Sequence, residues 1–272
     1  MSTIAIRHFF RMYRRVFANS TSTMLAYRSN LVFFFIFETM FLAGNFTSIA
    51  VGFHFAGGDI AGWTREQAFL MAAINSIGHQ VFICFFIGPL FGAPYKIWDG
   101  TMDYVFLKPM PRFLSIMLNA GEITVSNLPN LAITTALSVW LFVRSWADFS
   151  AGALVACLVF LVVGIMVRVA LAIFCLAPGF LAERLVGGED VFWSLSSAGR
   201  YPASVYGVWL ERFFTFGLPL AMLGSVQASV LFGKKAPLTH GLALMSSLLF
   251  VGLAAWFFHF AASRYKSVNS GV

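Results

Sequence analysis

Long runs of apolar residues, separated by short polar segments, dominate this chain. A helix crosses about 30 Å of hydrocarbon with roughly 20 apolar residues, so long runs with few charges predict membrane spans. Five runs meet this description: residues 31–52, 67–92, 123–143, 152–177 and 242–262. A sixth, 203–231, contains Glu211, Arg212 and Pro219. We therefore predict an all-α integral membrane protein with about six transmembrane helices, in a single transmembrane domain covering residues 1–272.

The sixth run allows two interpretations. It follows a polar segment that ends at Pro202. Either 203–231 spans once, or 191–201 is a short span and the remainder folds back as re-entrant helices shielded by protein, because lipid does not tolerate unpaired backbone groups. We favour the single span.

Residues 4–28 have an amphipathic helical pattern. Four arginines recur at helical spacing: Arg7, Arg11, Arg14 and Arg15. Five apolar or aromatic residues lie on the other side: Ile6, Phe9, Phe10, Tyr13 and Phe17. Such a helix lies in the membrane interface, with its aromatic side at the acyl boundary and its arginines among anionic headgroups. The alternative is a basic segment that only sets the topology.

The composition excludes a soluble globular protein, because the chain has too few charged residues to form a water-facing surface of ordinary size. Of the 272 residues, 59% are hydrophobic and 11% charged, whereas soluble domains average about 25% charged residues. The net charge of +7 comes from residues beside apolar runs rather than in one basic stripe, so we expect contact with the lipid bilayer and no nucleic acid partner. Three widely separated cysteines in apolar runs predict neither a disulfide framework nor a metal site.

The distribution of Lys and Arg predicts that both termini are cytoplasmic, because cytoplasmic loops carry an excess of positive charge. Twelve basic residues then fall inside: Arg7, Arg11, Arg14, Arg15, Arg28, Lys96, Lys108, Arg112, Arg184, Arg200, Arg264 and Lys266. Four fall outside: Arg65, Arg144, Lys234 and Lys235. The opposite orientation would reverse this bias.

Residues that hydrolyse ATP or bind a metal do not occur in the required patterns. The phosphate-binding pattern G-x-x-x-x-G-K-[ST] is absent from the sequence. The nearest carboxylate pair, Asp99 and Asp103, has no histidine close by, and the five histidines are scattered. We expect no enzymatic activity, no metal and no cofactor bound by this chain.

The loop at residues 93–112 faces the cytoplasm by the charge count. Asp99 is a suitable helix cap, Thr101 to Leu107 can form about two turns, and Pro109 ends them. The apolar residues of this short helix have no evident partner in so small a loop: Met102, Tyr104, Val105, Phe106 and Leu107. Exposed apolar clusters mark docking sites, and the alternative is that these residues lie on the bilayer.

The pattern G-x-M-D-x-x-x-x-K-P in this loop resembles that of type-2 ATP-binding-cassette permeases, and more narrowly their small drug-export branch. Its residues are Gly100, Met102, Asp103, Lys108 and Pro109. Three further features are similar to the family: the amphipathic N-terminal helix, Tyr201-Pro202 before an apolar run with Pro219, and Arg264-Tyr265-x-Ser267.

The resemblance implies a permease subunit in the bacterial cytoplasmic (inner) membrane that pairs with itself or with a sister permease. It also implies export of an amphipathic or lipidic molecule, driven by separate ABC ATPase subunits that bind ATP and Mg. The coupling residues would be Gly100, Thr101, Met102, Asp103, Tyr104, Val105, Phe106, Leu107, Lys108 and Pro109. Two other functions remain open: an ion-coupled secondary transporter, and a membrane assembly or anchoring protein that transports nothing.

Ionisable and polar residues inside the spans are candidates for the substrate path. Glu38 would attract a cation if it faced a cavity, and alternatively it pairs with Arg168 or a polar neighbour. Asn75 and His79 lie four apart on one helix face, which favours hydrogen bonds between helices over a binding site. Arg168 needs a carboxylate, a carbonyl or water, and we interpret it as structural.

Overall fold

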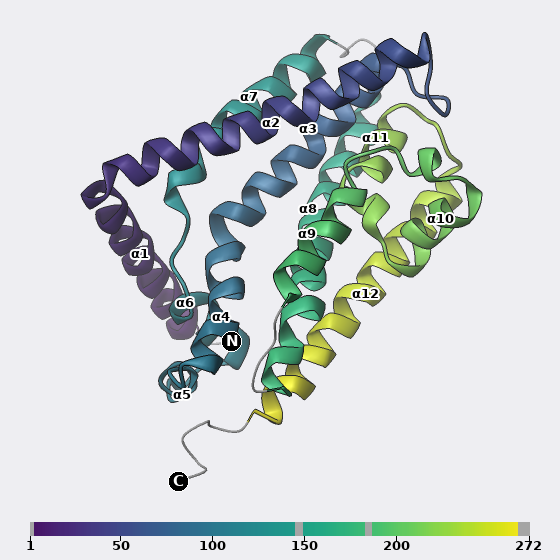
Figure 1. Ribbon diagram of the computed structural model, residues 1–272. Coiled ribbons are helices and arrows are strands. Elements are labelled where there is room, and N and C mark those ends of the chain that lie inside the picture. Colours follow the sequence, from purple (N-terminus) through teal and green to yellow (C-terminus); the bar gives the residue numbers. More distant parts are fainter. Residues whose placement is uncertain (1–2, 145–148, 183–186, 266–272) are drawn as a thin grey trace.

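A computed structural model describes residues 3–144, 149–182 and 187–265, with side chains from residue 11 onward (Figure 1). The described residues form helices and no strand, which confirms the all-α prediction. Five helices are long and apolar enough to cross a membrane: Arg28–Ala56, Arg65–Trp98, Val125–Arg144, Ala151–Phe180 and Pro237–Ser263. They correspond to the five clean apolar runs. Arg184, Lys266 and Ser267 lie outside the described residues.

The N-terminal amphipathic segment is helix α1, Thr3–Ala26, and the chain turns at Tyr27 into α2, Arg28–Ala56. Arg11, Arg14 and Arg15 are exposed on α1, whereas Tyr13 and Phe17 are half-buried. The aromatic side therefore contacts the protein itself as well as any surrounding lipid. The place of α1 in the membrane interface stays a prediction.

The second long helix continues beyond the predicted span 67–92. It comprises α3, Arg65–Phe82, a π-helical turn at Ile83–Ile87, and α4, Gly88–Trp98. Its 34 residues reach about 51 Å at 1.5 Å per residue, which exceeds the hydrocarbon thickness. The predicted loop 93–112 thus begins as helix. Pro89 causes no break because it lies in the first turn of α4, directly after the π-helical turn.

A compact set of short elements follows α4. Helix α5 covers Met102–Phe106, α6 covers Arg112–Asn119, the 3₁₀ turn η2 covers Val125–Asn127, and α7 covers Leu128–Arg144. The chain after α6 passes directly over α4, where a Cβ built on Gly88 would lie 2.0 Å from the carbonyl oxygen of Glu122. Figure 1 shows α5 and α6 at one end of the molecule, the end toward which α4 and α12 descend.

The core lies between α8, Ala151–Leu176, and two helices packed along it: α9, Gly188–Ala198, and α12, Pro237–Ser263 (Figure 1). Val167, Leu171 and Phe192 are fully buried in it. The 3₁₀ turn η4, Ala177–Phe180, extends α8 toward the end that carries α5.

The predicted sixth span, 203–231, is wrong as a single helix. The chain forms five short pieces there: η5 Ala203–Tyr206, α10 Val208–Arg212, the π turn η6 Phe213–Gly217, η7 Leu220–Leu223 and α11 Ser225–Leu231. Gly207 adopts a φ of 80° and Pro219 cannot continue a helix. Glu211 is paired with Lys235, which lies just before the last helix. The structure agrees with the alternative interpretation in having a short helix, α9, followed by folded-back short helices.

Polar side chains satisfy the backbone groups that these breaks release. Gln227 is fully buried and donates to the carbonyl oxygens of Phe160 at 3.1 Å and Met222 at 2.6 Å. The Ser225 hydroxyl accepts the N–H of Ala203 at 3.1 Å. A non-helical segment of this kind is tolerated at membrane depth only when protein shields it, and most of η7 and α11 is buried.

The closest helix contact in this region generates a stability prediction. A Cβ on Gly164 of α8 would lie 2.4 Å from the Met222 carbonyl oxygen and 2.7 Å from Gln227 Nε2. Gly164→Ala should therefore force α8 and η7 apart and cost about 1–3 kcal/mol, seen as a lower thermal unfolding midpoint in detergent. Gly252→Ala on α12 meets no atom within 4 Å and serves as the control. Equal midpoints for both variants would contradict the packing described.

Candidate functional site

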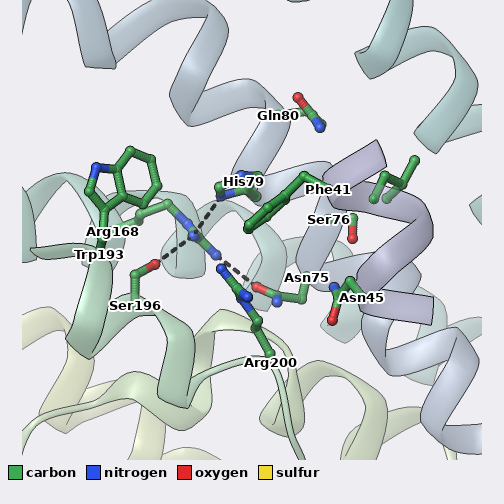
Figure 2. Close-up of a pocket in the computed structure, with 11 residues that line it drawn as sticks. Phe41, Asn45, Asn75, Ser76, His79, Gln80, Arg168, Trp193, Ser196 and Arg200 are labelled. Atoms are coloured by element: carbon green, nitrogen blue, oxygen red, sulfur yellow. Dashed lines mark hydrogen bonds between the residues drawn. The ribbon is translucent and has the colours of Figure 1, made fainter. Parts of the chain in front are cut away.

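Four helical segments enclose a small polar pocket (Figure 2), which we call the arginine pocket. Its polar lining comes from Asn45 on α2, from Asn75, Ser76, His79 and Gln80 on α3, from Arg168 on α8, and from Ser196 on α9 with Arg200 just after it. Phe41, Leu42 and Trp193 complete it. The cavity holds about 20 Å³, room for about one water molecule.

Arg168 is the centre of this pocket and is only 2% exposed. Its guanidinium group donates to Asn75 Oδ1 at 2.7 Å and to Ser196 Oγ at 2.9 Å, and lies 3.3 Å from His79 Nδ1 (Figure 2). The partners are an amide oxygen, a hydroxyl and an imidazole rather than a carboxylate. Asn75 and His79 thus form the bonds between helices that their spacing predicts.

Arg200, which the charge count placed in a cytoplasmic loop, lines this pocket in the structure. Helix α9 packs along α8, and Arg200 directly follows α9. Arg200 contacts α2 there, because its guanidinium carbon lies 4.4 Å from the centre of the Phe41 ring. Phe41 in turn stacks on His79, with ring centres 5.7 Å apart. The sequence prediction took 203–231 as the span and so left Arg200 in a loop, whereas the structure places it directly after α9 among the pocket residues.

Two glycines allow the segments around the arginine pocket to pack closely enough to form it. A Cβ on Gly224, at the start of α11, would lie 2.9 Å from the Cβ of Asn75. A Cβ on Gly199, at the end of α9, would lie 2.8 Å from a methyl carbon of Leu223. Small residues at these two positions let α9 and the short helices reach α3.

Glu38 lies beside the arginine pocket and forms no ion pair with Arg168. Its carboxylate accepts from Gln80 Nε2 at 3.5 Å, and the side-chain oxygen Oε1 of Gln80 accepts from Asn127 Nδ2. Asn130 continues this chain and accepts from the Thr39 hydroxyl at 2.9 Å. The sequence left open whether Glu38 faces a cavity, pairs with Arg168 or bonds a polar neighbour. The structure shows the last of these, with Gln80 as the neighbour. Gln80, Asn127 and Asn130 were missed, although polar residues inside an apolar run were the available signal.

The predicted coupling helix corresponds to α5, and three of its five apolar residues, Met102, Val105 and Phe106, have partners within the chain. Met102 is fully buried and Val105 is 4% exposed, and the Ser115 hydroxyl donates to the Val105 carbonyl oxygen. The expectation that all five apolar residues lack partners is therefore wrong. The loop is larger than its sequence suggested because α6 packs against α5.

Phe106 connects α5 to the ends of two long helices. Its ring stacks on Phe180 of η4, with centres 6.1 Å apart, and lies 5.7 Å from the ring of Tyr265, just after α12. The guanidinium carbon of Arg112 lies 5.3 Å from the Phe106 ring, and Arg112 donates to the Ala262 carbonyl oxygen. Burial of Tyr265, together with the nearby carboxylate of Asp103, raises the pKa of its hydroxyl to about 12.

The solvent side of α5 presents Tyr104, 71% exposed, and Leu107, 76% exposed. We call these two residues the coupling surface. Lys108, bonded to Asn119, and Pro109 are exposed beside it. Gly100 has the positive φ of 74° that the turn into α5 requires.

Asp99 shapes the turn that precedes α5. It accepts from the hydroxyl of Thr101 at 2.6 Å and from its N–H at 2.9 Å. These hydrogen bonds lower the pKa of the Asp99 carboxyl. The expectation that Asp99 caps the helix is therefore wrong: Thr101 is the N-cap of α5, no side-chain cap hydrogen bond is formed, and Asp99 instead closes the turn before Thr101.

The long apolar helices and the buried polar network together define a multi-pass membrane protein. A family model described as ABC-2 family transporter protein matches residues 39–269. The chain therefore belongs to the ABC-2 transporter family, as the sequence resemblance indicated. No curated protein and no solved structure gave a match.

Family membership defines the chain as the non-catalytic transmembrane component of an ABC transporter, and implies association with an ABC ATPase. Residues of the kind that bind metal do not cluster in the described part of the chain.

The arginine pocket predicts unequal effects for two serines of α9. Ser196→Ala removes a hydrogen bond to a buried charge and should cost about 1.5–3 kcal/mol, whereas the exposed Ser194→Ala should change stability little. Thermal unfolding of both purified variants in detergent compares them. The structural role of Ser196 is disproved if the two midpoints agree.

Proposed function

We propose that this chain is the permease subunit of an ATP-driven exporter of amphipathic molecules, and that a separate ATPase docks on the coupling surface. The observation that carries the proposal is the two-sided character of α5. Its outer side exposes Tyr104 and Leu107, while its inner side is held by Met102, Val105 and Phe106. A contact made outside is thereby connected to the membrane helices.

The charge distribution supports a cytoplasmic position for this end of the molecule. Lys96, Lys108 and Arg112 lie around α5, and cytoplasmic loops are rich in such residues. The chain leaves α12 at the same end (Figure 1), which fits two cytoplasmic termini. We place the permease in the bacterial inner membrane on the family resemblance.

The coupling mechanism follows from the contacts of Phe106. When the ATPase pair closes on ATP, a displacement of α5 would be carried through Phe106 to Phe180 and Tyr265, at the ends of α8 and α12. Apolar rings in close contact transmit displacement because packed interiors compress little. The two long helices are packed together along their length, so they would move as a unit.

A second permease is part of this proposal. Helix α2 is mostly exposed, and its large apolar residues include Phe33, Phe37 and Met40. Lipid or a second permease covers this face, and a substrate path between two permeases would run along it. Family membership favours this function over an ion-coupled secondary transporter or an anchoring protein.

The decisive test is ATPase binding by variants of the coupling surface. Leu107→Asp places a charge in the proposed contact, where desolvating an unpaired carboxylate costs several kcal/mol, and should abolish co-purification of the ATPase in detergent. Tyr104→Asp should act in the same direction. A charge at Val105 would instead test folding, because that side chain is buried.

Leu238→Asp is the matched control, since Leu238 is 74% exposed against 76% for Leu107 and lies in the first turn of α12, at the opposite end. An acidic residue is favourable in a helix's first turn, so expression and ATPase binding should persist. Retention of ATPase by Leu107→Asp and Tyr104→Asp would exclude α5 as the docking element.

A further inference from the structure

The arginine pocket contains two positively charged side chains and no negative one. Figure 2 shows the guanidinium group of Arg200 beside that of Arg168, and no Asp or Glu lines the cavity. The acidic residue Glu211 pairs with Lys235, and neither of them lines the cavity. Because Arg168 is buried and Arg200 is half-buried, water screens the repulsion between these two like charges only in part.

Hydrogen-bond donors in this pocket remain unused. Arg168 is 98% buried, yet its Nε–H has no partner within the described part of the chain. Arg200 makes only its contact with the Phe41 ring there. Buried donors in native proteins nearly always have partners, so the Nε–H of Arg168 indicates a ligand with an acceptor atom, and the half-buried Arg200 lines the same cavity.

The positive charge of Arg168 and Arg200 favours an anion over a water molecule as that ligand. A water molecule would satisfy the free donor, but it would leave two positive charges uncompensated. An anionic oxygen supplies both the acceptor and the opposite charge, and charge-assisted hydrogen bonds to guanidinium groups are the stronger kind.

The size and surroundings of the pocket favour a headgroup over a free ion. A cavity of about 20 Å³ admits one oxygen atom rather than a whole phosphate. Phe41, 36% exposed, borders it, and Phe37 and Met40 are exposed nearby on α2. An apolar tail can therefore lie along α2 while one oxygen of the headgroup enters.

We infer that the arginine pocket binds the anionic headgroup, a carboxylate or phosphate, of an amphipathic substrate. This inference rests on the proposed function, and it specifies the charge of the substrate. Glu38, the carboxylate that would favour a cation, is bonded to Gln80 and does not line the cavity.

The test is binding of dodecyl phosphate to the purified full-length chain in a neutral maltoside detergent. Ligands that bind the native state raise the unfolding midpoint in a saturable way, so the midpoint is followed against the concentration of dodecyl phosphate. We expect saturation with the unmodified chain and an affinity at least about tenfold lower for Arg200→Gln, a loss of about 1.4 kcal/mol. Arg200→Lys should keep part of the affinity because it keeps the charge.

Arg264→Gln is the matched control, because Arg264 also stacks on a phenylalanine, with its guanidinium carbon 4.5 Å from the Phe260 ring, but lies outside the pocket. Its affinity should equal that of the unmodified chain. Equal loss in Arg264→Gln and Arg200→Gln, or no saturable response at all, would overturn the inference. Inorganic phosphate that matches dodecyl phosphate would overturn the assignment to a headgroup.

Failure of this inference can be told apart from failure of the proposed function. Arg200→Gln should keep full ATPase co-purification, since Arg200 is remote from α5. An unmodified chain that binds dodecyl phosphate but no ATPase would refute the permease proposal alone. One that binds ATPase but not dodecyl phosphate would refute the anion site alone.

Discussion

Arg168 places a guanidinium group in the middle of α8 at 2% exposure, and satisfying it determines how the surrounding helices fit together. Apolar packing discriminates weakly between helix rotations in a membrane, because lipid tails are as apolar as leucine. Asn75 and Ser196 accept from this one side chain and so align α3 and α9 with α8. The same arrangement brings Arg200 in from the end of α9 and creates the pocket.

A second constraint acts at the end of the molecule that carries α5. A five-residue helix is too short to be stable alone, and α5 is held by burial of Met102 and Val105 and by the Phe106 contacts with η4 and Tyr265. The residues that stabilise it are therefore the ones that connect it to α8 and α12. The inner side of α5 thus provides both its stability and its connection to the long helices, which leaves Tyr104 and Leu107 on the outer side for a partner.

The sequence predicted what depends on local pattern. Apolar run length located the five long helices, and the arginine spacing located α1. It failed where contacts between folded segments decide: 203–231 breaks at Gly207, Pro219 and Gly224, and the broken pieces are held by Ser225 and Gln227 of α11, which bond Ala203, Met222 and, on α8, Phe160. The sequence identified Arg168, Asn75 and His79 one by one as polar residues inside apolar runs. It did not predict that they lie in one pocket with Arg200, because that depends on the position of α9, which was not predicted as a separate helix. The burial of Met102 and Val105 likewise depended on α6.

The central claim is that α5 and the ends of α8 and α12 move as one body when ATP binds. Pro111 is exposed at the start of α6, which packs against α5, and it lies outside the coupling surface. With the three native cysteines replaced by serine, spin labels on Pro111→Cys and Leu181→Cys report the separation of the α5–α6 unit from the end of α8, where Leu181 is 47% exposed. A second double variant, Pro111→Cys with Phe55→Cys, reports on α2, where Phe55 is 84% exposed. Pulsed electron resonance of the complex with its ATPase, with and without ATP, should give an unchanged distance from 111 to 181 and a changed distance from 111 to 55. A distance from 111 to 181 that shifts with ATP, while the distance from 111 to 55 stays constant, would contradict the account.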